Sequence, residues 1–285
     1  MPPPDPAPRP LSAATALALL EWQIAMGADE AIDASAPDRF AAAPVAPVPS
    51  PPIAARLEPR PAPARVPVAV APPSGLAESL AEAAVSARRL AAEAQSIAAL
   101  GEAVARFDDC PLKRTATNTV FMDGNPEAPI MIVGEAPGAD EDRIGKPFVG
   151  RAGQLLDLML AAIGLDRSKV QITNVIYWRP PGNRKPTTAE IASCLPFVLR
   201  HIALARPTAL VLAGGTAAGA LLSQSEGITR LRGRWFELAV PGLDAPVPTI
   251  PMFHPAFLLR TPERKRDAWR DLLAVRAKLD AIAAA

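Results

Sequence analysis

Beyond residue 107 the chain alternates short apolar runs with segments of helical periodicity. The apolar runs are rich in branched aliphatic residues and lie at 130–133, 170–177, 210–212 and 248–253. The helical segments lie at 153–163, 187–205 and 262–284, and Thr187 or Thr188 followed by Glu190 is typical of a helix N-terminus. This alternation predicts an α/β fold, a three-layer α/β/α sandwich around a central, mainly parallel four-stranded sheet.

The part of the chain before this region is divided by its prolines. Of 34 prolines, 18 lie in the first 75 residues, and 41–73 consists almost entirely of Ala, Pro and Val with a few charges. We therefore expect an N-terminal arm over 1–40, a flexible Pro/Ala-rich linker over 41–74, a helix over 75–106, and the main domain over 107–285. Residues 11–26 have the spacing of one amphipathic helix, which could dock on the main domain, bind an unidentified protein partner, or remain weakly ordered.

Charge and cysteine content narrow the class of protein. The net charge is +1, but residues 1–100 carry 7 basic and 10 acidic side chains, whereas 101–285 carry 23 and 19. The main domain is therefore mildly basic, enough for a local phosphate-binding face. Two cysteines exclude a disulfide scaffold, and we expect no signal peptide and no membrane span. These features predict a cytoplasmic protein.

Candidate chemistry gathers where the predicted strands end, which is where parallel sheets bind ligands. The loop after the first strand, 134–153, is rich in glycine, so its backbone could approach a ligand closely. It matches neither a Rossmann nor a P-loop pattern, and its four acids suit a nucleotide phosphate poorly. Asn174 lies in the second strand, and His254 follows the fourth. His201, the other histidine, falls within a helix, and we interpret it as structural.

Three motifs resemble those of the family 4 (type 4) bacterial uracil-DNA glycosylases. They are GEAPGADED with GKPFVGRAGQLLD at 134–157, NVIYWRPPGNRKP at 174–186, and HPAFLLR at 254–260. The resemblance covers roughly 107–278 and leaves 1–100 unexplained. It implies that the main domain has the uracil-DNA glycosylase fold and hydrolyses the N-glycosidic bond of a flipped-out deoxyuridine, leaving an abasic site for base excision repair. Uracil-containing DNA is then the partner, and we expect a nucleoid-associated monomer.

The resemblance assigns roles to residues of the predicted pocket. Phe148 would stack on uracil, while Asn174 would read O4 and N3–H with its amide. His254 would donate to O2 of the leaving base, and Glu135 would stabilise the sugar cation or position water, although it could instead organise the loop. Gly134 and Glu141 would complete the uracil pocket, with Glu141 near C5, where thymine carries its methyl group.

Further residues suit the DNA backbone and the space that the flipped base vacates. Arg184 and Lys185 lie on the second loop, Arg232 lies in TRLRGRW, and Thr216 follows two glycines at a predicted helix start. Leu258, Leu259 and Arg260 follow His254 and could wedge into the base stack. Charge runs are usually solvated faces, so each basic residue alone is a weak indication.

One departure from the family pattern concerns a metal cluster. The resemblance implies a [4Fe–4S] cluster held by four cysteines, of which Cys110 and Cys194 match the second and fourth. Phe107 and Trp178 stand at the other two positions, so we predict an apolar plug and no cofactor, unless unexpected ligands replace the missing thiolates. An alternative function is therefore a catalytically weak DNA-damage sensor on the same scaffold. A small-nucleotide enzyme using the loop at Gly134 is a third possibility.

Overall fold

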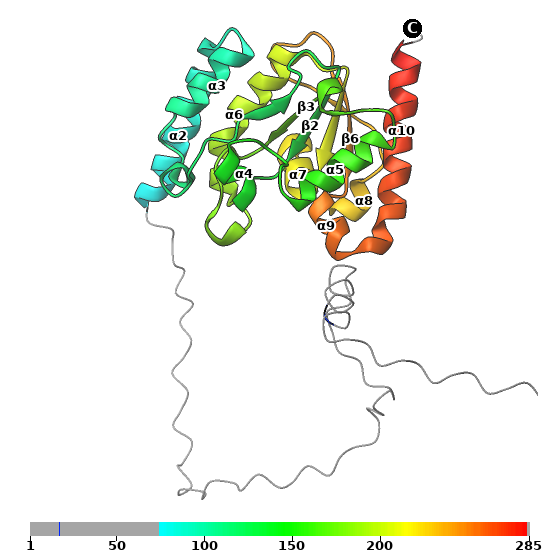
Figure 1. Ribbon diagram of the computed structural model, residues 1–285. Coiled ribbons are helices and arrows are strands. Elements are labelled where there is room, and N and C mark those ends of the chain that lie inside the picture. The colour runs from blue at the N-terminus through cyan, green and yellow to red at the C-terminus, as the bar shows by residue number, and fades with distance from the viewer. Residues whose placement is uncertain (1–16, 18–73, 284–285) are drawn as a thin grey trace, which may run out of the picture. The chain divides into compact units, whose positions relative to one another are not determined.

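The computed structural model describes Leu17 and residues 74–283, and its centre is one six-stranded sheet (Figure 1). The strand order is β1-β3-β2-β4-β6-β5. The four inner strands, β3, β2, β4 and β6, run parallel to one another, and the two edge strands are antiparallel to their neighbours. The strands span Met122–Gly124 (β1), Ile130–Gly134 (β2), Val170–Asn174 (β3), Ala209–Ala213 (β4), Phe236–Leu238 (β5) and Val247–Met252 (β6).

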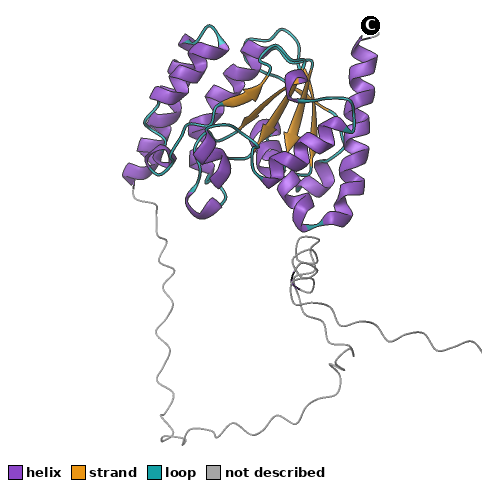
Figure 2. Cartoon of the chain, viewed as in Figure 1, coloured by secondary structure: helices purple, strands orange, loops and turns teal. Residues whose placement is uncertain are grey.

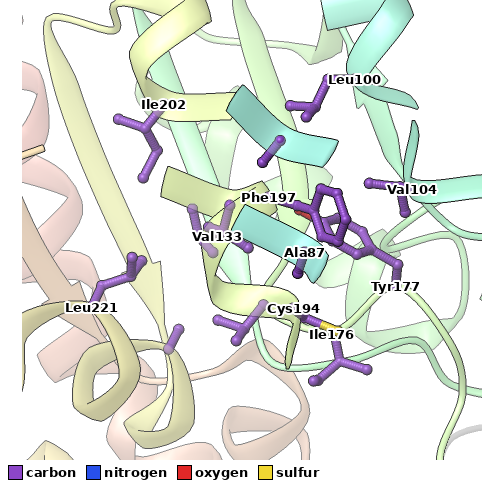
Figure 3. Packing of buried hydrophobic residues seen from close by; sticks show 14 of the residues in the cluster. Ala87, Leu100, Val104, Val133, Ile176, Tyr177, Cys194, Phe197, Ile202 and Leu221 are labelled. Atoms are coloured by element: carbon purple, nitrogen blue, oxygen red, sulfur yellow. The ribbon is translucent and has the colours of Figure 1, made fainter. Parts of the chain in front are cut away.

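Helices cover both faces of the sheet (Figure 2). Side chains alternate across a strand, so Met131 and Val133 of β2 belong to one apolar core while Ile130 and Ile132 belong to the other. The first core is closed by α2 (Ser74–Glu93), α3 (Ile97–Arg106), α6 (Thr188–Ala205) and α7 (Gly215–Leu222), and the second by α5 (Arg151–Ala161), α9 (Pro255–Arg260) and α10 (Lys265–Ala283). Figure 3 shows part of the first core, where Phe197 and Cys194 of α6 lie near Tyr177 and Ile176.

Short helices make up most of the remaining connections. They are α4 (Ala139–Ile144), α8 (Ile228–Leu231) and the 3-10 turns η1 (Pro111–Arg114), η2 (Arg167–Lys169), η3 (Pro181–Asn183) and η4 (Pro262–Arg264).

The predicted three-layer arrangement is confirmed, with two additions at the sheet edges. The four predicted strands are the four inner ones, although β3 ends at Asn174 rather than at Tyr177. The edge strands β1 and β5 have three residues each and are mostly half-buried or exposed, so they carry no apolar run that a sequence pattern could reveal. The sheet therefore has six strands instead of four.

The prediction of one continuous helix over 75–106 is wrong, because the chain breaks at 94–96. The Ser96 hydroxyl accepts a hydrogen bond from the Ala99 backbone amide, which makes Ser96 the N-cap of α3. At the end of α2, the Arg200 guanidinium donates to the Ala94 carbonyl at 2.7 and 3.0 Å. Both helix ends at the break thus have hydrogen-bond partners. The predicted helix at 11–26 and the linker up to residue 73 lie outside the described residues.

Helix α6 begins where its sequence predicts. Thr187 is the N-cap: its hydroxyl accepts from the Glu190 amide, and the Glu190 carboxylate accepts from the Thr187 amide at 2.7 Å. Of the described helices, α6 alone is long and apolar enough to cross a membrane. Its buried residues, among them Phe197, Val198 and Ile202, belong to the core between the sheet and α2.

A buried histidine lies on the inner face of α6. His201 is fully buried and stacks on Phe121, with ring centroids 4.9 Å apart. Within the described residues neither ring nitrogen has a hydrogen-bond partner. Burial lowers the pKa of His201 from 6.5 to about 4, because a charged imidazolium would lose its hydration here.

We expect this histidine to make stability depend on pH in the mildly acidic range. Between pH 6.5 and about 4 the unfolded chain binds the proton and the folded chain does not, so stability falls as pH falls through this window. The loss approaches about 3 kcal/mol for this one group. Urea unfolding of His201→Leu at several pH values should therefore show a smaller loss between pH 6.5 and 4.5 than wild type. An equal loss in both proteins would contradict the assignment.

Candidate active site

The carboxyl ends of the parallel strands meet at one edge of the sheet. Strand register pairs Gly134, the last residue of β2, with Asn174, the last residue of β3. On the other side of β2, the Gly214 amide after β4 donates to the Met252 carbonyl at the end of β6, at 2.9 Å. The residues that follow these strands, including Glu135 and His254, are thereby brought to the same edge.

A cavity of about 420 Å³ opens at this edge. That volume suits a small planar ligand such as a nucleobase with part of its sugar. The cavity takes residues from all three sequence motifs. Its lining consists of Glu135, Ala136, Pro137, Gly138, Glu141, Phe148, Ala152, Asn174, Pro180, Asn183, Arg184, Lys185, His254, Ala256, Phe257 and Arg260.

Gly134 lets an aromatic ring and an amide approach the same point of the backbone. A Cβ atom at Gly134 would lie 2.3 Å from Asn174 Oδ1 and 2.6 Å from two ring carbons of Phe148. Both contacts are far inside van der Waals range, so no other residue fits without displacing one of these side chains. The predicted contribution of Gly134 to the pocket therefore comes from its lack of a side chain.

The amide of Asn174 is left for a ligand. The residue is 2% exposed, and its side chain makes no hydrogen bond to any of residues 74–283. Because an amide offers an acceptor and a donor side by side, it can pair with a ligand edge that carries the complementary pattern. Asn174 lines the cavity, so this amide is accessible to a ligand that enters it.

His254 is held as a neutral hydrogen-bond donor. Its Nδ1 accepts from the Ala256 backbone amide at 3.1 Å, so His254 is the N-cap of α9 and the ring proton resides on Nε2. Its pKa is lowered from 6.5 to about 4, chiefly by burial and also by the positive charge of Arg260, while Glu141 acts in the opposite sense. The ring stacks on that of Phe148 with centroids 5.4 Å apart and an interplanar angle of 22°, and both rings line the cavity.

Glu135 and Thr216 form a pair that the sequence did not predict. The Thr216 hydroxyl, at the start of α7, donates to Glu135 Oε2 at 2.5 Å. This bond leaves Oε1 of the carboxylate for a ligand. Thr216 was predicted as a phosphate contact, whereas the structure connects its hydroxyl to the candidate catalytic carboxylate.

Both carboxylate oxygens of Glu141 accept hydrogen bonds from backbone amides of the loop. Its Oε2 accepts from the Gly138 amide at 3.0 Å, and its Oε1 accepts from the amides of Val149 and Gly150 at 2.9 and 2.8 Å. Glu141 therefore has the loop-organising hydrogen bonds that we considered for Glu135. Glu141 still lines the cavity, as the predicted contact near C5 requires.

The predicted cationic residues differ in what they are free to bind. Lys185 and Arg260 are exposed and line the cavity, whereas Arg184 already holds Glu190 through two hydrogen bonds of 2.9 and 2.6 Å. Arg232 is largely buried, pairs with Asp271 at 2.5 Å, and lies over the Phe253 ring. Lys185 and Arg260 therefore present the charges that are best placed for a phosphate at this site.

The two leucines of the third motif point to different surroundings. Leu258 is 1% exposed and packs in the core beneath α9, while Leu259 is 36% exposed. Leu259 is therefore the one available to enter a base stack. The sequence alone does not separate them, because they are adjacent on a short helix whose orientation depends on its contacts with α5.

A family model described as the uracil DNA glycosylase superfamily matches residues 121–273, which is more than half of the chain. The chain belongs to this superfamily. The matched region contains the whole sheet and every residue that lines the cavity. The fold and the family membership that the three motifs implied are thus confirmed.

Curated relatives place the chain near one branch of uracil-DNA glycosylases. A type-4 uracil-DNA glycosylase of Pyrobaculum aerophilum is 37% identical over 61% of this chain and 89% of its own length. Those of Archaeoglobus fulgidus and Thermotoga maritima are 42% and 40% identical, over 55% and 56% of this chain and 80% and 82% of theirs. The matched lengths are far shorter than this chain, which has 285 residues.

Several pocket residues of this uracil-DNA glycosylase homologue were not singled out from the sequence. Pro180 and Asn183 line the cavity from the loop after β3, and Asn183 has a left-handed φ of 55°. Ala152 and Phe257 line it from α5 and α9. The two loops had been recognised by their motifs, but nothing in a loop sequence shows which of its side chains face inward.

The four positions at which the resemblance implies cluster ligands lie together in the first core. Phe107, Cys110, Trp178 and Cys194 are each at most 1% exposed. The ring centroids of Phe107 and Trp178 are 6.3 Å apart, and Phe107 also packs edge-on against Phe197 at 5.1 Å. Both cysteines are free and buried, and the Cys194 thiol lowers the pKa of Cys110 although burial raises it.

We expect the imidazole of His254 to stay neutral down to mildly acidic pH. A pKa of about 4 and the bond from Ala256 to Nδ1 together predict the Nε2–H tautomer throughout pH 5–9. Two-dimensional NMR of ¹⁵N-histidine-labelled protein distinguishes the tautomers and follows the titration. A midpoint near 6.5, or a proton on Nδ1, would contradict this account of the site.

Proposed function

We propose that the chain is a monofunctional uracil-DNA glycosylase that hydrolyses the bond between uracil and its deoxyribose in DNA. The observation that carries the proposal is the arrangement of Asn174, Phe148 and His254 around one cavity, with an unpartnered amide, an aromatic wall and a neutral donor. The type-4 names of the relatives support the same reaction. The activity, the DNA partner and base excision repair as its setting are parts of one proposal.

Recognition precedes chemistry in this scheme. A uracil extruded from the helix stacks on the Phe148 ring and turns its O4 and N3–H edge to the Asn174 amide. Cytosine presents a donor and an acceptor in the opposite order at that edge, so the same amide orientation rejects it. Lys185 and Arg260 contact phosphates, and Leu259 occupies the space that the base leaves.

The glycosidic bond then breaks with its electron pair moving to N1 of uracil. Negative charge spreads to O2, where the Nε2–H of His254 stabilises it as a neutral hydrogen-bond donor. Positive charge develops on the sugar, and the Glu135 carboxylate, oriented by Thr216, stabilises it or positions the water that adds to C1′. Water supplies the hydroxyl group of the abasic sugar, and its second proton neutralises the uracil anion.

Replacing Asn174 should change which base is accepted. In Asn174→Asp the carboxylate has lost the donor for O4, so uracil excision should fall by roughly tenfold to a hundredfold, which corresponds to the ~1–3 kcal/mol cost of one lost buried hydrogen bond. Oligonucleotides with one uracil or one cytosine, followed by alkaline cleavage, measure both activities. An unchanged ratio of uracil to cytosine excision would refute the reading role.

Replacing His254 should slow the reaction more than it weakens binding. The His254→Ala protein loses the donor to O2, which predicts a loss of about 10²- to 10³-fold in kcat with a much smaller change in KM.

Absence of uracil release by wild type, together with retained DNA binding, would favour the alternative of a DNA-damage sensor. The monomeric state and the cellular location stay predictions.

The cluster-type positions do not fit a [4Fe–4S] cluster in this chain. Such a cluster needs four suitable ligands, and two of the four positions carry aromatic rings, which supply no ligand and pack in the same buried core as the remaining thiols. Among the described residues no group of three or more His, Cys, Asp or Glu side chains converges on one point. In relatives that carry a cluster, the cluster joins these segments of the chain. We therefore infer that the packing of Phe107 and Trp178 joins the same segments here.

Iron should accordingly be dispensable to the protein. Anaerobic reconstitution with iron and sulfide should leave wild type without an absorption band at about 400 nm, whereas the Phe107→Cys/Trp178→Cys variant, with all four thiolates, should gain it. Iron analysis of the purified wild-type protein provides the second measurement. A stoichiometric iron content in wild type would overturn this inference.

A further inference from the structure

Phe148 has a backbone conformation that needs outside support. Its φ is 54°, in the left-handed region, where a bulky side chain is strained. Its carbonyl is directed at Gly153, where a Cβ atom would lie 1.7 Å from the carbonyl oxygen. The ring direction thus depends on whatever holds this peptide in place.

One arginine holds the carbonyl side of the segment. The Arg167 guanidinium, from η2, donates to the Phe148 carbonyl and, at 3.3 Å, to the Pro147 carbonyl. It is itself fixed by Asp157 of α5 at 2.8 Å and by Asp123 of β1 at 2.7 Å. The fork of five donors in arginine can satisfy two carboxylates and two carbonyls at once, which a lysine ammonium cannot do with the same geometry.

The amide side of the segment is held independently by Glu141, which accepts from Val149 and Gly150. Phe148 is therefore fixed between a cation on its carbonyl and an anion on the amides that follow. Burial opposes ionisation of Asp123, yet Arg167 and Lys146 lower its pKa below the ordinary range, so this carboxylate stays charged at neutral pH.

We propose that Arg167 is a positioning residue for the base-stacking ring of Phe148, and that it sets the efficiency of base capture without touching the base. Arg167 does not line the cavity, and its side chain is 26% exposed. The inference rests on the proposed function in one respect, namely that Phe148 stacks on the extruded base.

A double-mutant cycle tests whether Arg167 acts through the ring. Arg167→Met should lower kcat/KM on a single-uracil oligonucleotide by about tenfold to a hundredfold, because a displaced platform misplaces the base. Arg167→Lys should lose less, since the charge remains. In a Phe148→Ala background, Arg167→Met should cost no more than about twofold, because the ring that it positions is gone. Equal fold-losses in both backgrounds would overturn the proposal.

Two further measurements separate positioning from general stability. Binding of an oligonucleotide with one 2′-fluoro-deoxyuridine, which resists cleavage, should weaken in the same non-additive pattern, even if wild type proves to have no glycosylase activity. All assays are made below the Tm of every variant, and if Arg167→Met does not fold, the lysine variant in both backgrounds decides. Arg276→Met is the matched control, because Arg276 pairs with Asp280 on the exposed side of α10 and should leave activity unchanged.

Discussion

The site depends on the absence of a side chain at Gly134. Parallel pairing brings this residue level with Asn174, and the space where a Cβ would sit is shared by the Asn174 amide and the Phe148 ring. A single methyl group there would push apart the two groups that contact the base in the proposed function. The register of β2 and β3 therefore decides which side chains share the pocket at Gly134. Glu135 and His254 follow the ends of parallel strands and lie around this position.

Local pattern was enough to predict the inner sheet and its functional edge. Strands such as β2 and β4 are buried along their whole length, so their sequences are continuous apolar runs that pattern analysis detects. His254 stood out as a polar residue directly after such a run, and Asn174 stood out as a polar residue inside one. Edge strands such as β1 carry no comparable signal, because three half-buried residues pair with a neighbour only once the sheet exists.

Charged residues were harder to interpret, since their partners are distant in sequence. Arg232 lies in a run of alternating arginines that resembles a solvated face, yet its partner Asp271 is 39 residues further along the chain. Arg167 likewise depends on Asp123, 44 residues before it. Thr216 was expected to meet phosphate, and its hydrogen bond to Glu135 spans 81 positions. Such pairings become visible only after the fold has brought the segments together.

The hydrogen bond from Ala256 to His254 couples the position of α9 to the orientation of the imidazole ring. One short helix carries Leu259 and Arg260 on its solvent side and is capped at its start by the imidazole. The ring cannot rotate without releasing the first amide of that helix, and the helix cannot shift without moving the ring. In the proposed function, contact with the DNA strand and support of the departing base therefore depend on the position of the same short helix, and a substrate that contacts α9 poorly is expected to meet a misaligned donor.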